Sequence, residues 1–196
     1  MTVERPAVVP GSRALVWPWL ALSVLGAAAR VGHLSWGDDF GVRVPSLASA
    51  GAWGAGFVAL VVAQEVIGHR LWSTVDTWPD AWSGIRVAVR AVTIVVAAPI
   101  SEELLYRGLL FTRIADWGGV VIAVAFTAIV STIAHGRRGA TVRMMILADA
   151  AYYGCARAVT GSVVLPIAFH CVGNAYAVYE RTRRSRLSGR ECRPRR

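Results

Sequence analysis

Long apolar runs, rather than an alternation of apolar and polar positions, dominate the sequence. Each run approaches the roughly 20 residues that an α-helix needs to cross the core of a bilayer. A soluble domain of this size would instead show helices with one apolar and one polar face. We therefore predict an all-α fold, a polytopic membrane helix bundle of about six transmembrane helices. The predicted spans are 14–34, 50–68, 85–112, 118–135, 142–159 and 162–179.

The third predicted span is too long to cross a bilayer upright. At 1.5 Å per residue its helix would measure about 42 Å, against a hydrocarbon core of ~30 Å. It must therefore tilt, break or begin in the membrane interface. Arg86 and Arg90 in its first turns favour an interfacial start. Pro99 predicts a kink, because proline removes one backbone donor and crowds the preceding turn.

The first predicted span allows an alternative interpretation as a cleaved signal peptide. Arg5 and Arg13 precede an apolar run that passes through Ala27, Ala28 and Ala29, as at a cleavage site. That run continues to Leu34 and is longer than the apolar region of a typical signal peptide. We therefore favour a retained membrane helix.

Charge in the loops predicts the orientation in the cell membrane. Cytoplasmic loops of membrane proteins carry an excess of basic residues. This places the segment 1–13, the loop 69–84, the loop with Arg137 and Arg138, and the tail 181–196 in the cytoplasm, and Asp38 outside. Residues 14–180 form the predicted transmembrane bundle, with both termini cytoplasmic.

Composition agrees with a membrane protein and disfavours a nucleic-acid partner. The chain is 55% hydrophobic with a mean hydropathy of +0.49, and only 17% of its residues are charged, against about 25% in soluble domains. Its net charge is +9, and all 21 basic residues are Arg, eight of them in the tail 181–196. No aromatic residues or nucleic-acid motifs accompany them, so anionic lipid headgroups are the predicted partner. Arg-only usage with abundant Ala and Gly indicates a GC-rich bacterial genome.

Two adjacent acids, Glu102 and Glu103, lie within the apolar stretch 91–111. An ionisable group at bilayer depth costs at least ~2.5–3.5 kcal/mol, so such groups usually face a cavity or a partner. Glu103 and Arg107 are spaced i, i+4 and are predicted to pair. Glu102 lies about 100° further around the helix and stays free to act as a base. A purely structural ion pair with one spare acid remains the alternative.

Other polar residues lie in apolar surroundings further along the chain. His135 ends the fourth predicted span, while His170 and Asn174 share one face of the last span at i, i+4. Taken alone, His170 and Asn174 are equally explained as a hydrogen-bonding pair between helices. Asp149, with the neighbouring Tyr152 and Tyr153, is a candidate for lining a cavity. Together with the acids, these residues supply the groups that hydrolysis needs.

The set resembles the three motifs of the CPBP intramembrane proteases, a family that includes the type II CAAX prenyl proteases and bacterial bacteriocin-processing and lysostaphin-resistance-like proteins. The first motif is Glu102-Glu103-x-x-x-Arg107, the second ends in His135, and the third is His170-x-x-x-Asn174. The resemblance covers 92–179, the predicted catalytic core. One departure is Ser131, where the family's second motif usually has Phe; this is expected to alter packing or pocket shape.

The resemblance implies a role for each motif residue. Glu102 would be the general base that activates water, supported by Glu103 and Arg107. His135 and His170 would complete the centre, and Asn174 would polarise the scissile carbonyl or stabilise its oxyanion. The family is regarded as metalloproteases, so a divalent metal such as zinc, with His135 and His170 as ligands, is one expectation. A metal-free glutamate mechanism is equally allowed, because the compact H-E-x-x-H spacing is missing.

These observations predict an intramembrane endopeptidase that hydrolyses a peptide bond of a membrane-associated protein or peptide by Glu-activated water. The predicted bond lies at or just inside the inner face of the membrane. The substrate is not identified, and prenylated CAAX tails are not expected in a bacterium. The alternative is a non-catalytic membrane immunity or assembly factor that keeps the motif residues as a structural polar core. A proton-coupled transporter is disfavoured, because the sequence shows no inverted repeat.

Overall fold

The computed structural model describes residues 13–71, 85–136 and 139–191. These residues form six helical rods and no strand, so the predicted all-α fold with six helices is confirmed. The third rod is a continuous helix, residues 85–118, that twice widens into a π turn. The elements are α1 (Arg13–Val31), α2 (Leu47–Leu71), α3 (Ile85–Val92), the π turn η1 (Thr93–Ala97), α4 (Ala98–Glu103), the π turn η2 (Leu104–Leu110), α5 (Phe111–Gly118), α6 (Val120–Ala134), α7 (Ala140–Thr160) and α8 (Val164–Glu191).

The helix bounds depart from the predicted spans at two places that bear on the site. Gly119, with φ of +85°, separates α5 from α6, which is therefore only 15 residues long. A positive φ of this size suits glycine because it has no Cβ. At the other end of the chain, α8 continues to Glu191 and so includes the first part of the Arg-rich tail. Its sequence has no proline after Pro166 until Pro194, and the arginines favour helix.

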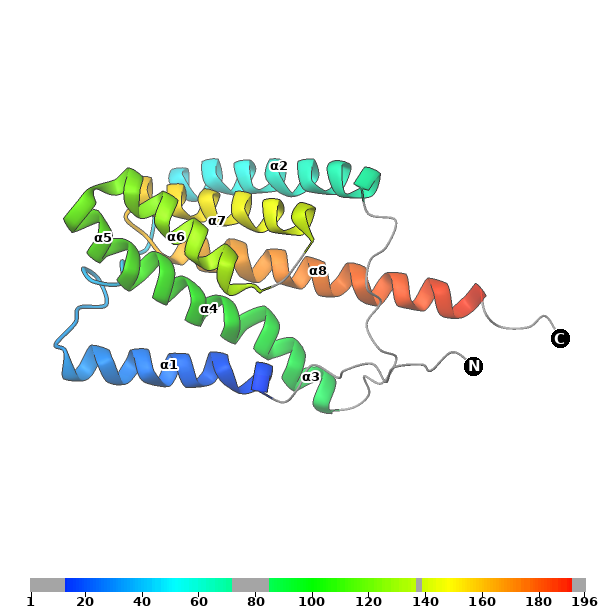
Figure 1. Ribbon diagram of the computed structural model, residues 1–196, viewed down its shortest axis with the longest axis horizontal. Helices are drawn as coiled ribbons and strands as arrows, with labels where there is room; N and C mark the ends of the chain where they lie inside the picture. The colour runs from blue at the N-terminus through cyan, green and yellow to red at the C-terminus, as the bar shows by residue number, and fades with distance from the viewer. Residues whose placement is uncertain (1–12, 72–84, 137–138, 192–196) are drawn as a thin grey trace.

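The rods run alternately up and down (Figure 1). The chain segment between α1 and α2, the α5–α6 junction and the α7–α8 junction lie together at one end of the bundle. The end of α2 and the starts of α3 and α7 lie toward the other end, where α8 extends beyond its neighbours. The charges that predict the orientation lie largely outside the described residues, in the segments 1–12, 72–84, 137–138 and 192–196.

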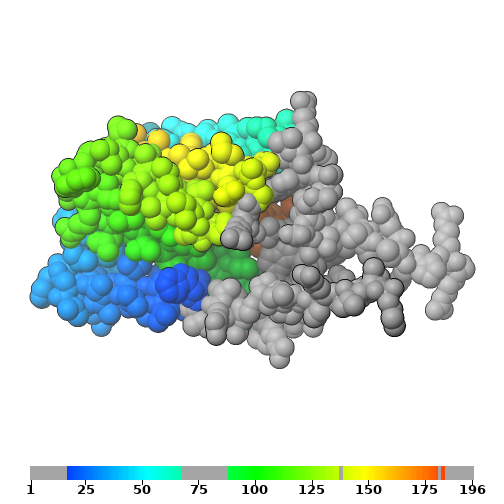
Figure 2. Space-filling model, in the orientation of Figure 1, coloured from blue at the N-terminus to red at the C-terminus, as the bar shows by residue number. Residues whose placement is uncertain are grey.

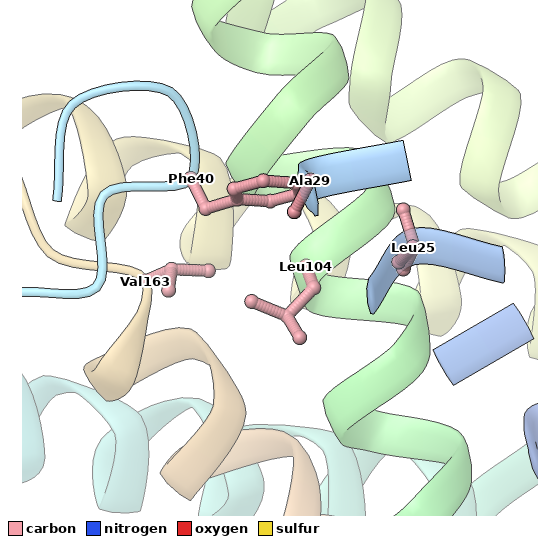
Figure 3. Packing of buried hydrophobic residues seen from close by; sticks show 5 residues of the cluster. All are labelled: Leu25, Ala29, Phe40, Leu104 and Val163. Atoms are coloured by element: carbon pink, nitrogen blue, oxygen red, sulfur yellow. The ribbon is translucent and has the colours of Figure 1, made fainter. Parts of the chain in front are cut away.

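Two apolar clusters flank the helix that carries the acids. In the first, Leu104 at the start of η2 packs among α1, the segment after it and the residue before α8 (Figure 3). The members of this cluster are Leu25, Ala29, Phe40, Leu104 and Val163. In the second, Phe57 of α2 stacks on Phe169 of α8 with ring centroids 4.9 Å apart. Because Leu104 follows Glu103 and Phe169 precedes His170, both clusters fix residues next to the polar centre.

Evidence for membrane spans differs from helix to helix. One helix among the described residues, Leu47–Ile67 within α2, is long and apolar enough to cross a membrane, and little of it is buried. Val120–Ala134 is also apolar but shorter. The face of the bundle formed by α5 and α6 is turned to the viewer in Figure 2. α6 exposes a row of large apolar side chains: Val120, Val121, Ile122, Phe126, Ile129 and Ile133.

Candidate active site

Pro99 shapes the helix on which Glu102 and Glu103 lie. Proline has no N–H, so it cannot donate to the preceding turn. The helix continues through Pro99 and widens just before it, where the Ala98 N–H bonds to the Thr93 carbonyl five residues back. Such π turns are frequent at functional sites. The irregularity predicted at Pro99 is therefore found as a π turn within a continuous helix.

Asn174 of α8 contacts this π turn directly. Its side-chain amide donates to the Ile94 carbonyl at 2.9 Å. In the i→i−5 pattern of a π turn, the donor to Ile94 would be the residue at 99, which is proline. Asn174 thus supplies the hydrogen bond that Pro99 cannot make. The amide carries two N–H donors, and this bond uses one of them.

Glu103 and Arg107 form the predicted i, i+4 ion pair. Arg107 Nη1 lies 3.2 Å from Glu103 Oε1, and both side chains are buried, with 2% and 0% exposed. Arg107 also donates from Nη2 to the Ala150 carbonyl of α7 at 2.8 Å. Glu103 Oε2 has no hydrogen-bond partner among the described residues. Oε1 therefore accepts all the hydrogen bonds that this carboxylate makes there.

Ser131, which departs from the second motif of the family that the sequence resembles, belongs to the same network. It is buried in α6, donates to the Ala128 carbonyl at 3.1 Å and lies 3.5 Å from Arg107 Nη2. A phenylalanine could make neither hydrogen bond. The substitution thus brings a polar group to the arginine that holds Glu103.

His170 is held on its Nδ1 side by Glu103. Nδ1 lies 2.9 Å from Glu103 Oε1, and the imidazole stacks on the Tyr153 ring at 5.7 Å between centroids. An ionised carboxylate only accepts, so Nδ1 carries the proton of this bond. In neutral His170, Nε2 is then the acceptor. It points toward Glu102, with 4.0 Å between Nε2 and Glu102 Oε2.

His135 is oriented in the same sense from another helix. It lies just after Ala134 at the end of α6, and its Nδ1 is 2.7 Å from the Ser131 carbonyl. A carbonyl is also only an acceptor, so Nδ1 again carries the proton. Its Nε2 lies 3.9 Å from Glu102 Oε2.

Side chains from three helices lie close together at Glu102. α4, the end of α6 and α8 bring its carboxylate and the two Nε2 atoms together, as the sequence predicted. The short α6 makes this possible, because it ends partway along the bundle (Figure 1). Glu102 and His135 are 30% and 32% exposed, whereas Glu103 is fully buried. The two adjacent acids therefore have different environments: one is accessible and one is enclosed.

The candidate cavity-lining residues divide between the site and its surroundings. Tyr153 lies under His170, and its ring centroid is also 5.7 Å from the Arg107 guanidinium carbon. Asp149 accepts a 2.8 Å bond from Gln64 of α2, and Tyr152 donates to the Trp53 carbonyl. Sequence reasoning missed how Tyr153 supports both His170 and Arg107. The one signal in the sequence was its position near Asp149, which made it a candidate for lining a cavity.

Glu102, His135 and His170 carry donor atoms of the kind that bind zinc. Two ligand atoms that each lie ~2.1 Å from a tetrahedral zinc are about 3.4 Å apart. Glu102 Oε2 is 3.9 and 4.0 Å from the two Nε2 atoms. Within the described ranges, no three His, Cys, Asp or Glu side chains are grouped closely enough to hold a metal ion. The donors are of the right kind, but their arrangement does not fit a metal centre.

Comparison with known proteins identifies the part of the chain that carries this site. Residues 84–176 match the family model described as "Type II CAAX prenyl endopeptidase Rce1-like". The matched region contains every motif residue from Glu102 to Asn174. No curated protein and no solved structure matches the chain. The stretch 84–176, just under half of the chain, is thus similar to the Rce1-like family of type II CAAX prenyl endopeptidases.

Proposed function

We propose that the protein is an intramembrane endopeptidase in which Glu102 activates the water that attacks a peptide bond. The family is one of membrane-embedded proteases, which supports a protease at the coarse level. The observation that carries the proposal is the arrangement around Glu102. Two imidazoles, each bonded through Nδ1 to a fixed acceptor, present Nε2 at 3.9 and 4.0 Å from its carboxylate.

These separations suit one shared water molecule. If a water oxygen lies about 2.8 Å from each of two atoms that are 4 Å apart, the angle between the two hydrogen bonds at that oxygen is near 90°. Such an angle is compatible with hydrogen-bond geometry. Glu102 accepts a proton from the water while the water oxygen attacks the carbonyl carbon. The tetrahedral intermediate then collapses, the C–N bond breaks, and the proton passes from Glu102 to the leaving amine.

The enclosed pair supports this proton transfer. Arg107 keeps Glu103 ionised, and Glu103 stabilises the positive charge that His170 gains when its Nε2 takes up a proton from solvent before the water attacks. His170 can then donate that proton toward the oxyanion of the intermediate. Asn174, whose second N–H is not used on Ile94, is the other candidate donor. No step in this scheme requires a metal.

A membrane-associated peptide or protein is the proposed substrate. α2 is long and apolar enough to span a bilayer, and α6 exposes a row of large apolar side chains that suits contact with lipid. We infer that the other rods share the membrane with them, as a multi-pass bundle with cytoplasmic termini. The accessible Glu102 and the end of α6 then lie within reach of peptides at the inner face.

The non-catalytic alternative explains only part of the centre. A structural polar core requires the buried Glu103–Arg107 pair and its bonds to Ala150 and His170. It does not require Glu102, which is partly exposed and has no hydrogen bond among the described residues. A carboxylate kept near two imidazoles at this distance is better explained by a reacting molecule between them.

Proteomic comparison of membrane-protein termini in cells tests the proposal. We expect Glu102→Gln to abolish one or more termini that the wild type produces, while the variant protein is inserted at normal abundance. Asp116→Asn is the matched control, since it makes the same acid-to-amide change at an exposed position of α5. If no terminus depends on Glu102, the protease proposal is wrong.

A further inference from the structure

The second π turn, η2, leaves the backbone carbonyl of Arg107 in need of a donor. In an α-helix the Phe111 N–H would bond to this carbonyl, four residues back. Here the Phe111 N–H bonds to the Tyr106 and Gly108 carbonyls instead. The donor to the Arg107 carbonyl comes from another helix, from Nε of Arg157 in α7 at 3.0 Å.

Arg157 is enclosed against η2. Its side chain is buried, Nη2 lies 3.3 Å from Thr112 Oγ1, and its guanidinium carbon is 5.4 Å from the Phe111 ring centroid. The segment between α1 and α2 packs closely over Arg157, since a Cβ at Gly41 would come within 2.5 Å of the guanidinium, and the φ of +67° at this position favours glycine. Arg157 thus bridges the carbonyl of residue 107 and the side chain of residue 112.

Stability alone does not explain a charge in this position. Burying a guanidinium costs several kcal/mol unless a carboxylate compensates it, and an apolar side chain of similar volume is often at least as stable. Within the described ranges, no acid forms an ion pair with Arg157. Its hydrogen bonds go to a backbone carbonyl and a hydroxyl in the helix that carries the acids.

One face of α7 contacts both the guanidinium and the backbone carbonyl of Arg107. Ala150, Tyr153 and Arg157 are spaced i, i+3 and i+7 and so share a face of that helix. The Ala150 carbonyl accepts from the guanidinium of Arg107, the Tyr153 ring lies beside it, and Arg157 donates to the backbone carbonyl. The first π turn is held in the same way, since Asn174 of α8 donates to the Ile94 carbonyl of η1. α4, which carries both acids, lies between these two attachments.

We propose that Arg157 is a positioning residue for the catalytic centre. By holding the Arg107 carbonyl it fixes the backbone of η2, and this places the Arg107 guanidinium on Glu103 and, through Glu103, the imidazole of His170. The inference rests on the proposed hydrolytic function. It assigns Arg157 no contact with the substrate, so its loss should affect the rate of the chemical step more than substrate binding.

The test uses the full-length protein in liposomes and a fluorescence-quenched peptide that spans a Glu102-dependent cleavage site found in cells. We expect Arg157→Met to lower kcat at least tenfold with KM within twofold. The thermal unfolding temperature should stay close to that of the wild type, because removal of a buried, unpaired charge offsets the loss of the donor to the Arg107 carbonyl. Thr112→Val, which removes the second anchor of Arg157 without removing a charge, should lower kcat severalfold with KM unchanged. Arg113→Met, at an exposed arginine of the same rod, is the control and should match the wild type.

A double variant with Ser131 distinguishes a positioning role of Arg157 from a general contribution to stability. Ser131→Ala also acts through the Arg107 guanidinium, so the double variant Arg157→Met/Ser131→Ala should lose less than the product of the two single losses. Wild-type kcat in both Arg157→Met and Thr112→Val, with Glu102→Gln inactive, overturns the inference and leaves the proposed function intact. If Arg157→Met is not inserted, Thr112→Val decides alone. An active Glu102→Gln overturns the proposed function itself.

Discussion

Arg107→Met removes the guanidinium that compensates the most deeply buried acid of the described chain. Glu103 has no exposed surface, and Arg107 contacts it at 3.2 Å. After the substitution Glu103 keeps one hydrogen bond, from His170 Nδ1 at 2.9 Å. Methionine fills much of the volume of the arginine stem, so the change tests charge more than packing.

The expected cost follows from the burial of both partners. Removing one partner of a buried ion pair typically costs ~3–5 kcal/mol, because the other charge is left uncompensated. The remaining bond to His170 places this case at the lower end, at about 3 kcal/mol. For a chain of this length, that corresponds to a fall of roughly 6–12 °C in the unfolding temperature. The exposed pair of Arg113 and Asp39 should contribute no more than about 1 kcal/mol.

Thermal unfolding of the purified protein in detergent micelles measures the effect. The variants required are Arg107→Met, Glu103→Gln, the double variant, and Arg113→Met as the control. In the double variant no charge remains to be compensated, so its unfolding temperature should lie above that of Arg107→Met alone. The difference is the coupling between the two residues, expected at up to ~3 kcal/mol.

Two outcomes would refute this reasoning. The first is an Arg107→Met variant that unfolds within about 2 °C of the wild type, because the buried charge would then cost almost nothing. The second is a double variant as unstable as Arg107→Met, because the loss would then come from packing rather than from the unpaired carboxylate.

Three further predictions concern neighbouring groups. Ser131→Phe, which introduces the residue usual at this position of the resembled motif, should lower cleavage activity and cost about 1–3 kcal/mol of stability through overpacking. Ser131→Ala should have only a small effect on both. Higher cleavage activity with Phe would show that catalysis does not depend on the contact between Ser131 and Arg107. Asn174→Leu should leave the Ile94 carbonyl unsatisfied, cost about 1–3 kcal/mol and reduce cleavage; unchanged unfolding and cleavage would contradict the role given to that bond. Treatment with 1,10-phenanthroline should leave peptide cleavage unchanged, because the ligand spacing does not fit zinc; a loss that added zinc restores would contradict this.

The sequence predicted those features of the site that follow from local spacing. Glu103 and Arg107 pair because i, i+4 residues are neighbours on any helix, and the six helices lie where the sequence has extended apolar runs. The convergence of His135 and His170 on Glu102 also matched the expectation from the motifs. Only Leu47–Ile67 passes the length and composition test for a span among the described residues, because most other rods carry charges or are shorter.

Features that depend on contacts between helices were beyond sequence reasoning. The π turns on either side of α4 require donors from α7 and α8 to bond the carbonyls of Ile94 and Arg107, and no local pattern reveals that pairing. Pro99 indicated an irregularity but not its form. Arg157 drew no attention in the sequence, because a lone arginine near the end of a predicted span is usually explained by an interfacial position.

Cleavage kinetics of Glu102→Gln test the central claim most directly. The measurement is kcat for the purified protein in liposomes, with the peptide whose terminus depends on Glu102 in cells and with Asp116→Asn as the control. General acid–base catalysis contributes typically 10²–10⁴-fold. Loss of the carboxylate at an otherwise intact site should therefore lower kcat by at least about 100-fold, while Asp116→Asn matches the wild type. A Glu102→Gln enzyme that is correctly folded and cleaves within about tenfold of the wild-type rate would contradict the assignment of Glu102 as the base.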